Sequence, residues 1–106
     1  MKLGRVIGTV WATRKVDSLI GTALQIVQDV NLDYSPKDAF VVAVDGVGAG
    51  VSEIVLYASG SSARQTPITS DRPVDAVIMA IVDRLDVSVD AGSMIVPDAP
   101  EHADGG

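Results

Sequence analysis

The fold of this chain is decided by residues 39–60, which read AFVVAVDGVGAGVSEIVLYASG. Two apolar runs, at residues 39–45 and 53–60, enclose a short segment that holds three glycines in five positions. β-branched residues favour strands, and glycine is typical of the turns that join them. We therefore predict two strands separated by a tight turn, and the uninterrupted first run predicts a strand buried on both faces.

Three further segments extend the strand pattern in both directions. Residues 3–14 (LGRVIGTVWATR) show no helical stripe, and apolar residues alternate with polar neighbours in residues 19–30 (LIGTALQIVQDV). Residues 76–83 (AVIMAIVD) could form a helix, but β-branched side chains lose χ1 freedom in helices, so we predict a strand. Loops are expected at residues 31–38 and 61–73. Five short strands with these connections predict an all-β fold, a small closed or nearly closed barrel.

The chain length sets the domain organisation. A chain of 106 residues and 11.0 kDa is long enough for one domain and too short for two. We expect residues 1–88 to form the barrel and residues 89–106 to form a short acidic C-terminal extension. A brief strand or helix is expected near residues 94–96. The last ~10 residues are expected to be flexible, because chain ends with few apolar residues fray.

The charge balance argues against two classes of partner. The net charge is −6, and the whole acidic excess lies in residues 51–106. A chain this acidic has no long-range attraction for phosphate backbones or anionic lipid, so neither nucleic acid nor a membrane is expected as a partner. No apolar run reaches the ~18 residues that a membrane span needs, and no signal peptide is visible. A cytoplasmic location is therefore expected.

The residue types give no support to catalytic, cofactor or metal sites. Cysteine is absent, which excludes disulfides, thiolate metal sites and a cysteine nucleophile. The single histidine, His102, stands four residues from the end. Acidic pairs such as Asp83 and Asp86 are typical of a solvated face, because nothing nearby supplies an apolar pocket that would raise a carboxyl pKa. We expect neither an enzyme nor a bound cofactor.

The apolar content points to assembly. Hydrophobic residues make up 47% of the chain, yet aromatic residues make up only 4% of the chain. A domain of about 100 residues removes only roughly 60–70% of its unfolded surface from water. Interfaces between subunits resemble domain cores cut in half, so they can bury what the small barrel cannot. We therefore expect the aliphatic surplus to lie between copies of the chain.

The glycine-rich segment GVGAGV (residues 46–51) invites comparison with a phosphate-binding loop. It follows a predicted strand but leads into another strand, whereas the dinucleotide fingerprint needs a helix N-terminus at the pyrophosphate. No lysine of the P-loop kind follows it. Glycine permits both a tight turn and the close approach of two chains, and these two interpretations are favoured over nucleotide binding.

The polar string GSSAR (residues 60–64) allows two interpretations. Ser61 and Ser62 could donate to a small polar ligand or line a pore, with Arg64 contacting an anion. Alternatively, the string is an ordinary polar loop, or Arg64 bridges to a carboxylate of a neighbouring subunit. The second interpretation is favoured, and it makes Arg64 a residue of the subunit interface.

Four segments resemble one known family in their order and spacing. They read GRVIGTVWATRK, LIGTALQIVQ, FVVAVDGVGAGVSEIVLYASGSSAR and PVDAVIMAIVDRLDV. Together they extend over residues 1–87 and resemble the ethanolamine-utilisation/carboxysome vertex proteins, which are the pentameric shell proteins of bacterial microcompartments. Ser52 departs from the pattern, because it stands where the family commonly has glycine, and serine does not adopt a positive φ cheaply.

The resemblance implies a barrel similar to an OB-fold and a pentamer that caps the five-fold vertices of a polyhedral shell, beside hexameric shell proteins in the bacterial cytoplasm. It implies no reaction. The alternative is an OB-type binding module for an oligonucleotide or another ligand. A ring of five needs head-to-tail contacts, and small residues would let backbones approach across them. The candidate subunit-interface or pore-loop residues are Gly48, Ala49, Gly50, Ser52, Glu53, Gly60, Ser61, Ser62 and Arg64.

Overall fold

The computed structural model describes residues 1–19, 21–60 and 75–88. Its elements are β1 (Lys2–Val10), the short 3₁₀ helix η1 (Asp17–Leu19), β2 (Leu24–Val30), β3 (Pro36–Asp45), β4 (Ile54–Ser59) and β5 (Ala76–Ile81). The predicted all-β fold is confirmed, and the ambiguous C-terminal segment forms a strand. Its β-branched residues fit a pleated surface better than a helix.

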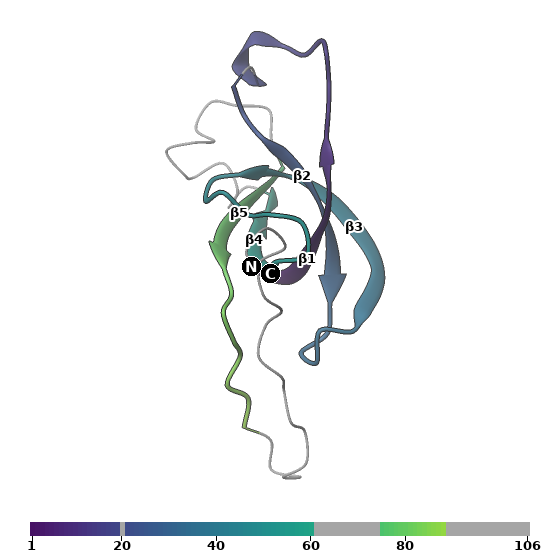
Figure 1. Ribbon diagram of the computed structural model, residues 1–106, viewed down its shortest axis with the longest axis vertical. Helices are drawn as coiled ribbons and strands as arrows, with labels where there is room; N and C mark the ends of the chain where they lie inside the picture. Colours follow the sequence, from purple (N-terminus) through teal and green to yellow (C-terminus); the bar gives the residue numbers. More distant parts are fainter. Residues whose placement is uncertain (20, 61–74, 89–106) are drawn as a thin grey trace.

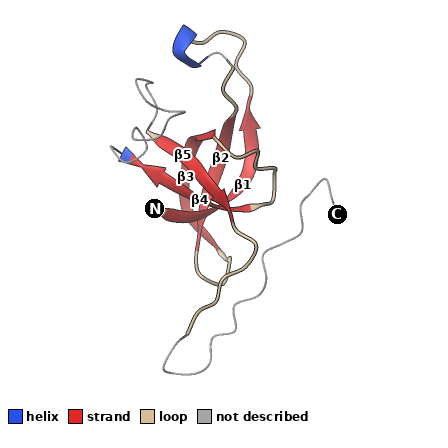
Figure 2. Ribbon diagram, turned by 90° about the vertical axis from the view of Figure 1, so that its left-hand side faces the viewer, coloured by secondary structure: helices blue, strands red, loops and turns tan. Residues whose placement is uncertain are grey.

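The five strands close into a barrel in the order β1-β2-β3-β5-β4 (Figures 1 and 2). Every neighbouring pair is antiparallel except β3 and β5, which run parallel and pair only at Val44 with Val77 and at Asp45 with Ile78. Beyond this short contact the two strands diverge, so β3 and β5 curve around opposite sides of the barrel (Figure 1). Closure leaves few free strand edges.

The barrel interior is filled by small aliphatic side chains. Val6, Val27 and Val55 are fully buried there, and Tyr57 from β4 is the aromatic member of this cluster. The interior is tight at Gly4, where an added Cβ would collide with the Val27 side chain and lie 3.0 Å from the Gln28 carbonyl oxygen. A chain poor in aromatics can fill a barrel this narrow with valine and alanine.

Two smaller clusters cover the outside of the barrel. Val44, Ala58 and Val77 pack against Leu24 and against Leu19 at the end of η1, although the η1 segment projects beyond the barrel (Figure 2). At the other end lie Val30, Tyr34 and Ile54 with the partly buried Leu3, Val82 and Leu85. The Val82 amide donates to the Ile54 carbonyl at 2.8 Å, which fastens the chain after β5 to the barrel.

The prediction that residues 39–45 are buried on both faces is wrong for the isolated chain. Ala43 and Val44 are buried, but Phe40 is 57% exposed and Val42 is 51% exposed. Only one face of β3 looks into the barrel, and the described residues add no second layer outside Phe40 and Val42. A run of β-branched residues has the same pattern whether its outer face is covered by its own chain or by another.

Three predicted boundaries are also corrected. The expected loop at residues 31–38 is shorter, because β3 already begins at Pro36, a first strand position that proline tolerates. The strands expected within residues 3–14 and 19–30 are shorter, because β1 ends at Val10, β2 begins at Leu24, and η1 lies between them. The expected loop at residues 61–73 and the expected element at residues 94–96 lie outside the described residues. Across the described chain, no helix has the length and apolar character required to cross a membrane.

Candidate functional site

The glycine-rich segment predicted as a turn connects β3 to β4 and lies against β1. The Ser52 amide donates to the Val6 carbonyl at 2.8 Å, and the Val6 amide donates to the Glu53 carbonyl at 3.0 Å. These bonds form beside an irregularity in the β1–β2 pairing, between Val6 and Gly8. The loop of residues 46–53 is therefore joined to the barrel wall by backbone hydrogen bonds.

Asp45 shapes the beginning of this loop. Its Oδ1 accepts hydrogen bonds from the amides of Val47 at 3.0 Å and Gly48 at 2.9 Å, which is the usual way in which aspartate stabilises a turn. Gly48 has a φ of 77°, a left-handed conformation that only glycine adopts without strain. The glycine at this position is required by the turn itself.

Gln25 holds the middle of the loop, and the sequence pattern did not predict this role. Its side chain from β2 is only 7% exposed, its Nε2 donates to the Ala49 carbonyl at 3.0 Å, and Nε2 also lies 3.4 Å from Asp45 Oδ2. Thr9 donates from its hydroxyl to Gln25 Oε1 at 2.7 Å. The alternation of side chains along a strand could have predicted its burial, because Gln25 stands two residues from the inward-facing Val27 and shares its face.

Glu53 closes the loop from its other end. It is 5% exposed, and its Oε1 accepts a hydrogen bond from the Gly50 amide at 2.5 Å. A Cβ added to Gly50 would lie 3.3 Å from the same oxygen, so a larger residue would displace the carboxylate. Ser52, between them, has a φ of 81°. The loop thus contains an L-residue in the left-handed region, which costs free energy.

Six of the nine candidate interface or pore-loop residues lie among the described residues. Ala49 is 4% exposed and belongs to the core of its own barrel, whereas Gly48 is exposed. Gly60 has a φ of 65°, and its amide donates to the Asp75 carbonyl at 2.9 Å. Gly50, Ser52 and Glu53 complete the loop. Ser61, Ser62 and Arg64 lie outside the described residues.

Ionisable groups are not gathered at this loop into a reactive cluster. Within residues 1–19, 21–60 and 75–88, no group of three or more His, Cys, Asp or Glu side chains could hold a metal ion. Tyr57 donates its hydroxyl to Asp29, and burial followed by this hydrogen bond raises the pKa of that hydroxyl above its ordinary value. The Tyr57 hydroxyl is thereby kept protonated at neutral pH.

Two open pockets lie away from the loop. One of about 330 Å³ is lined by Lys2, Leu3, Asp29, Val30, Asn31, Leu32 and Lys37, and one of about 370 Å³ lies beside Trp11, Lys15 and Thr22. Trp11 is 91% exposed. Neither pocket includes a residue of the 46–53 loop. Asp45 and Glu53 accept hydrogen bonds from amides of the loop, and Gln25 donates to its Ala49 carbonyl, so the arrangement supports a rigid turn.

The structure defines a class of small all-β proteins. Its marks are a closed five-stranded barrel, a rigid glycine-rich turn and apolar side chains on the outer wall. The family model described as "Ethanolamine utilisation protein EutN/carboxysome" matches residues 1–83. The chain belongs to this family, and the resemblance read from its sequence is confirmed.

Curated relatives in this family are named as shell vertex proteins. The carboxysome shell vertex protein CcmL of Gloeobacter violaceus is 42% identical over 82% of this chain and 87% of its own length. The bacterial microcompartment shell vertex protein PduN of Salmonella typhimurium is 45% identical over 80% of this chain and 98% of its own length.

Solved structures agree with the fold. The structure of Gloeobacter violaceus CcmL has a TM-score of 0.76 at 44% identity and covers 85% of this chain and 91% of its own. The structure of GrpN from Rhodospirillum rubrum, described as a pentameric microcompartment shell protein, has a TM-score of 0.75 at 44% identity, covering 83% of this chain and 100% of its own.

Proposed function

We propose that this chain is a structural shell protein of a bacterial microcompartment, which forms pentamers that cap the five-fold vertices of the polyhedral shell. The observation that carries the proposal is the match over most of the chain to relatives named as shell vertex proteins, one of them described as pentameric. The protein then resides in the microcompartment shell, within the bacterial cytoplasm.

Exposed apolar side chains on the barrel support assembly. Phe40 and Val42 present more than half of their surface to solvent on a strand that the sequence pattern marks as doubly buried. Apolar patches of this kind commonly mark protein–protein contacts. In a shell, the pentamer has further neighbours, and we propose hexameric shell proteins as the partners that surround it.

The role is one of assembly, without catalysis, cofactor or nucleic acid. Two buried polar side chains, Gln25 from β2 and Glu53 from the loop, bond to the backbone of the 46–53 loop, as a positioned turn requires. The net charge of −6 disfavours a nucleic-acid partner. We place the 46–53 loop and the 60–64 string at the subunit interface or the central opening of the ring.

Arg64 is the residue of the string that we assign to the interface. It is the only basic residue between Lys37 and Arg72, in a half of the chain rich in carboxylates. A guanidinium can pair with a carboxylate across a contact from which most water is excluded. Removal of the guanidinium then leaves the carboxylate unpaired, which lowers the stability of the contact. In a closed ring the loss recurs at every interface.

Native mass spectrometry across a concentration series tests the proposal. The wild-type protein should give a species of five times the 11.0 kDa chain mass. Arg64→Ala should dissociate at a higher protein concentration than the wild type, and Arg64→Lys should recover part of the loss. A wild-type monomer at micromolar concentration that binds single-stranded oligonucleotides would overturn the proposal in favour of an OB-type binding module. Equal dissociation midpoints for the three proteins would show that Arg64 does not contribute to the subunit interface.

A further inference from the structure

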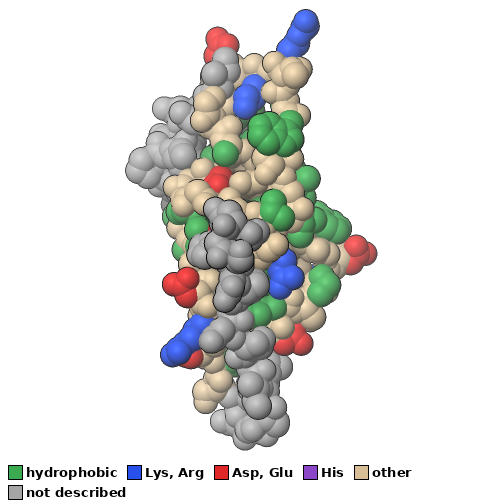
Figure 3. Space-filling view, viewed as in Figure 1, with side chains coloured by type: hydrophobic (Ala, Val, Ile, Leu, Met, Phe, Trp, Pro, Cys, Tyr) green, Lys and Arg blue, Asp and Glu red, His purple; other side chains and the backbone are tan. Residues whose placement is uncertain are grey.

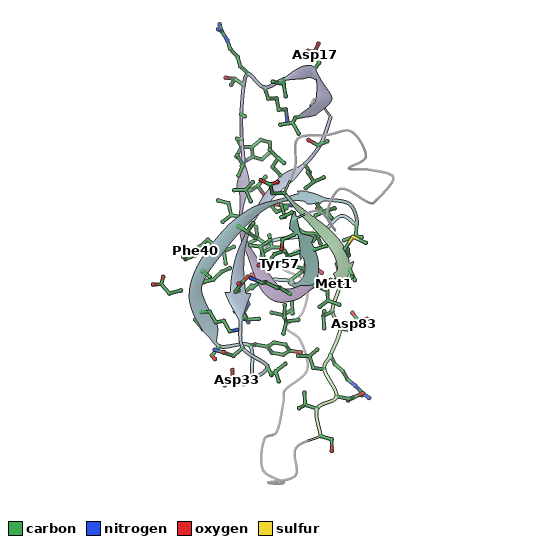
Figure 4. The ribbon with its side chains drawn as sticks, turned by 180° about the vertical axis from the view of Figure 1, so that it is seen from behind. Met1, Asp17, Asp33, Phe40, Tyr57 and Asp83 are labelled. Carbon is green, nitrogen blue, oxygen red and sulfur yellow. The ribbon has the colours of Figure 1, made fainter. Side chains whose placement is uncertain are left out.

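Three apolar side chains form one surface on the outside of the barrel, which we call the β2–β3 face: Ile26, Phe40 and Val42. Ile26 pairs directly with Val42 across the two strands, and Phe40 is two residues from Val42 on the same strand. Cross-strand partners and residues two apart share a face of a sheet. In Figure 4, Phe40 points away from the barrel while Tyr57 lies within its ring of strands.

This face is open to solvent in the single chain. Phe40 and Val42 are 57% and 51% exposed, and Ile26 is partly exposed. Hydrophobic side chains are visible over this side of the molecule in Figure 3. The outer face of an antiparallel strand normally carries polar residues, so an apolar row at this place indicates that another surface covers it.

A second apolar surface, which we call the β4–β5 face, consists of Leu56, Met79 and Ala80. Leu56 pairs with Ala80, and an irregularity in the pairing leaves Met79 without a cross-strand partner. Met79 is 39% exposed. Because β3 and β5 curve around opposite sides of the barrel, the two faces look in different directions (Figures 1 and 4).

We infer that the β2–β3 face of one subunit packs against the β4–β5 face of the next subunit in the ring. The inference rests on the proposed pentamer. In a ring of five, no subunit is related to its neighbour by a two-fold axis, so each contact joins two different patches of the same chain. Two apolar faces on opposite sides of one barrel meet that requirement. The occupant of the β2–β3 face is therefore a second copy of this chain.

A charge placed on either face should disrupt the ring without entering the barrel core. Val42→Asp and Met79→Asp are compared with Leu32→Asp, a control at a residue that is also 51% exposed but follows β2, away from both faces. Circular dichroism checks that each variant keeps its fold. Native mass spectrometry should show that both face variants dissociate at concentrations at least tenfold higher than the wild type, while Leu32→Asp matches the wild type. A Val42→Asp ring of unchanged stability would overturn the inference. That result is expected if residues 89–106 of the same chain, and not a second copy, cover the face. The wild-type pentamer would still stand.

Cross-linking keeps the inference testable if a charged variant fails to fold. The chain has no cysteine, so introduced thiols are the only reactive ones. The double variant Val42→Cys with Met79→Cys, treated with a short bis-maleimide, should give covalent species up to the pentamer on a denaturing gel. Each single variant should stay monomeric there. A covalent dimer from Val42→Cys alone would indicate a two-fold contact and overturn the inference, as would a double variant that yields only monomers.

Discussion

Ser52 stands where the family resemblance predicts glycine, and its backbone has the conformation that suits glycine. Its φ of 81° lies in the left-handed region, while its amide still donates to the Val6 carbonyl at 2.8 Å. The hydrogen bond to β1 and the turn at Gly48 hold the loop in this path. The serine Cβ is therefore accommodated at a cost, of order 1 kcal/mol for a non-glycine residue in this region.

Replacing Ser52 by glycine should stabilise the protein. We expect Ser52→Gly to raise the free energy of unfolding by about 0.5–1 kcal/mol, since relief of strain outweighs the extra freedom that glycine gains in the unfolded chain. Ser52→Ala keeps the Cβ and should give no gain. Ser59→Gly, in β4, should destabilise by a similar amount. Urea denaturation at one fixed protein concentration measures all three, and a destabilised Ser52→Gly would show that the hydroxyl matters more than the backbone.

At the scale of elements, the loop between β3 and β4 depends on side chains from two other strands. Thr9 from β1 and Gln25 from β2 form a short chain of hydrogen bonds that ends at the Ala49 carbonyl. Gln25 is 7% exposed, so the groups that it pairs have little access to water. The position of the loop is thus determined by neighbours in the barrel as well as by its own glycines.

Gln25→Leu should loosen the loop. The substitution leaves the Ala49 carbonyl and the Thr9 hydroxyl without this partner, and we expect a loss of about 1–3 kcal/mol in the free energy of unfolding. Hydrogen exchange should accelerate at the amides of Val47, Gly48 and Gly50. Thr9→Val removes one bond of the chain and should cost less. Unchanged exchange in Gln25→Leu would mean that Asp45 and Glu53 hold the loop without help.

At the scale of the whole molecule, the five strands of the closed barrel all lie within residues 2–81. The strand order closes with β5 between β3 and β4, and Val82 and Leu85 cover the cluster around Ile54. Residues 97–106 hold Pro97, Pro100 and a terminal Gly-Gly, with few apolar side chains. We propose that this end of the chain takes no part in closing the ring.

Truncation after Val96 should leave assembly intact. The shortened chain should form a ring of the same number of subunits and dissociate over the same concentration range as the full chain, because it keeps the five described strands of the barrel. Light scattering and native mass spectrometry measure both properties. A truncated protein that falls apart into monomers would show that residues 97–106 belong to the interface.

Much of the fold follows from local sequence pattern. β-branched runs placed the strands now seen as β3, β4 and β5, because the preference of these side chains for an extended backbone is a local property. The turn glycine Gly48 was foreseen for the same reason, since a left-handed φ constrains one residue at a time. The family likeness rests on these same runs and turns, in their order along the chain.

Only the tertiary structure decided which side of each strand is covered. Gln25 became a buried support of the loop because closure of the barrel brings β2 beside residues 45–49, a contact between residues about twenty apart in the chain. Phe40 and Val42 stayed exposed because the described chain places no layer outside β3 there. Burial depends on strand order, register and neighbouring elements, and these are long-range properties that alternation within one strand does not contain.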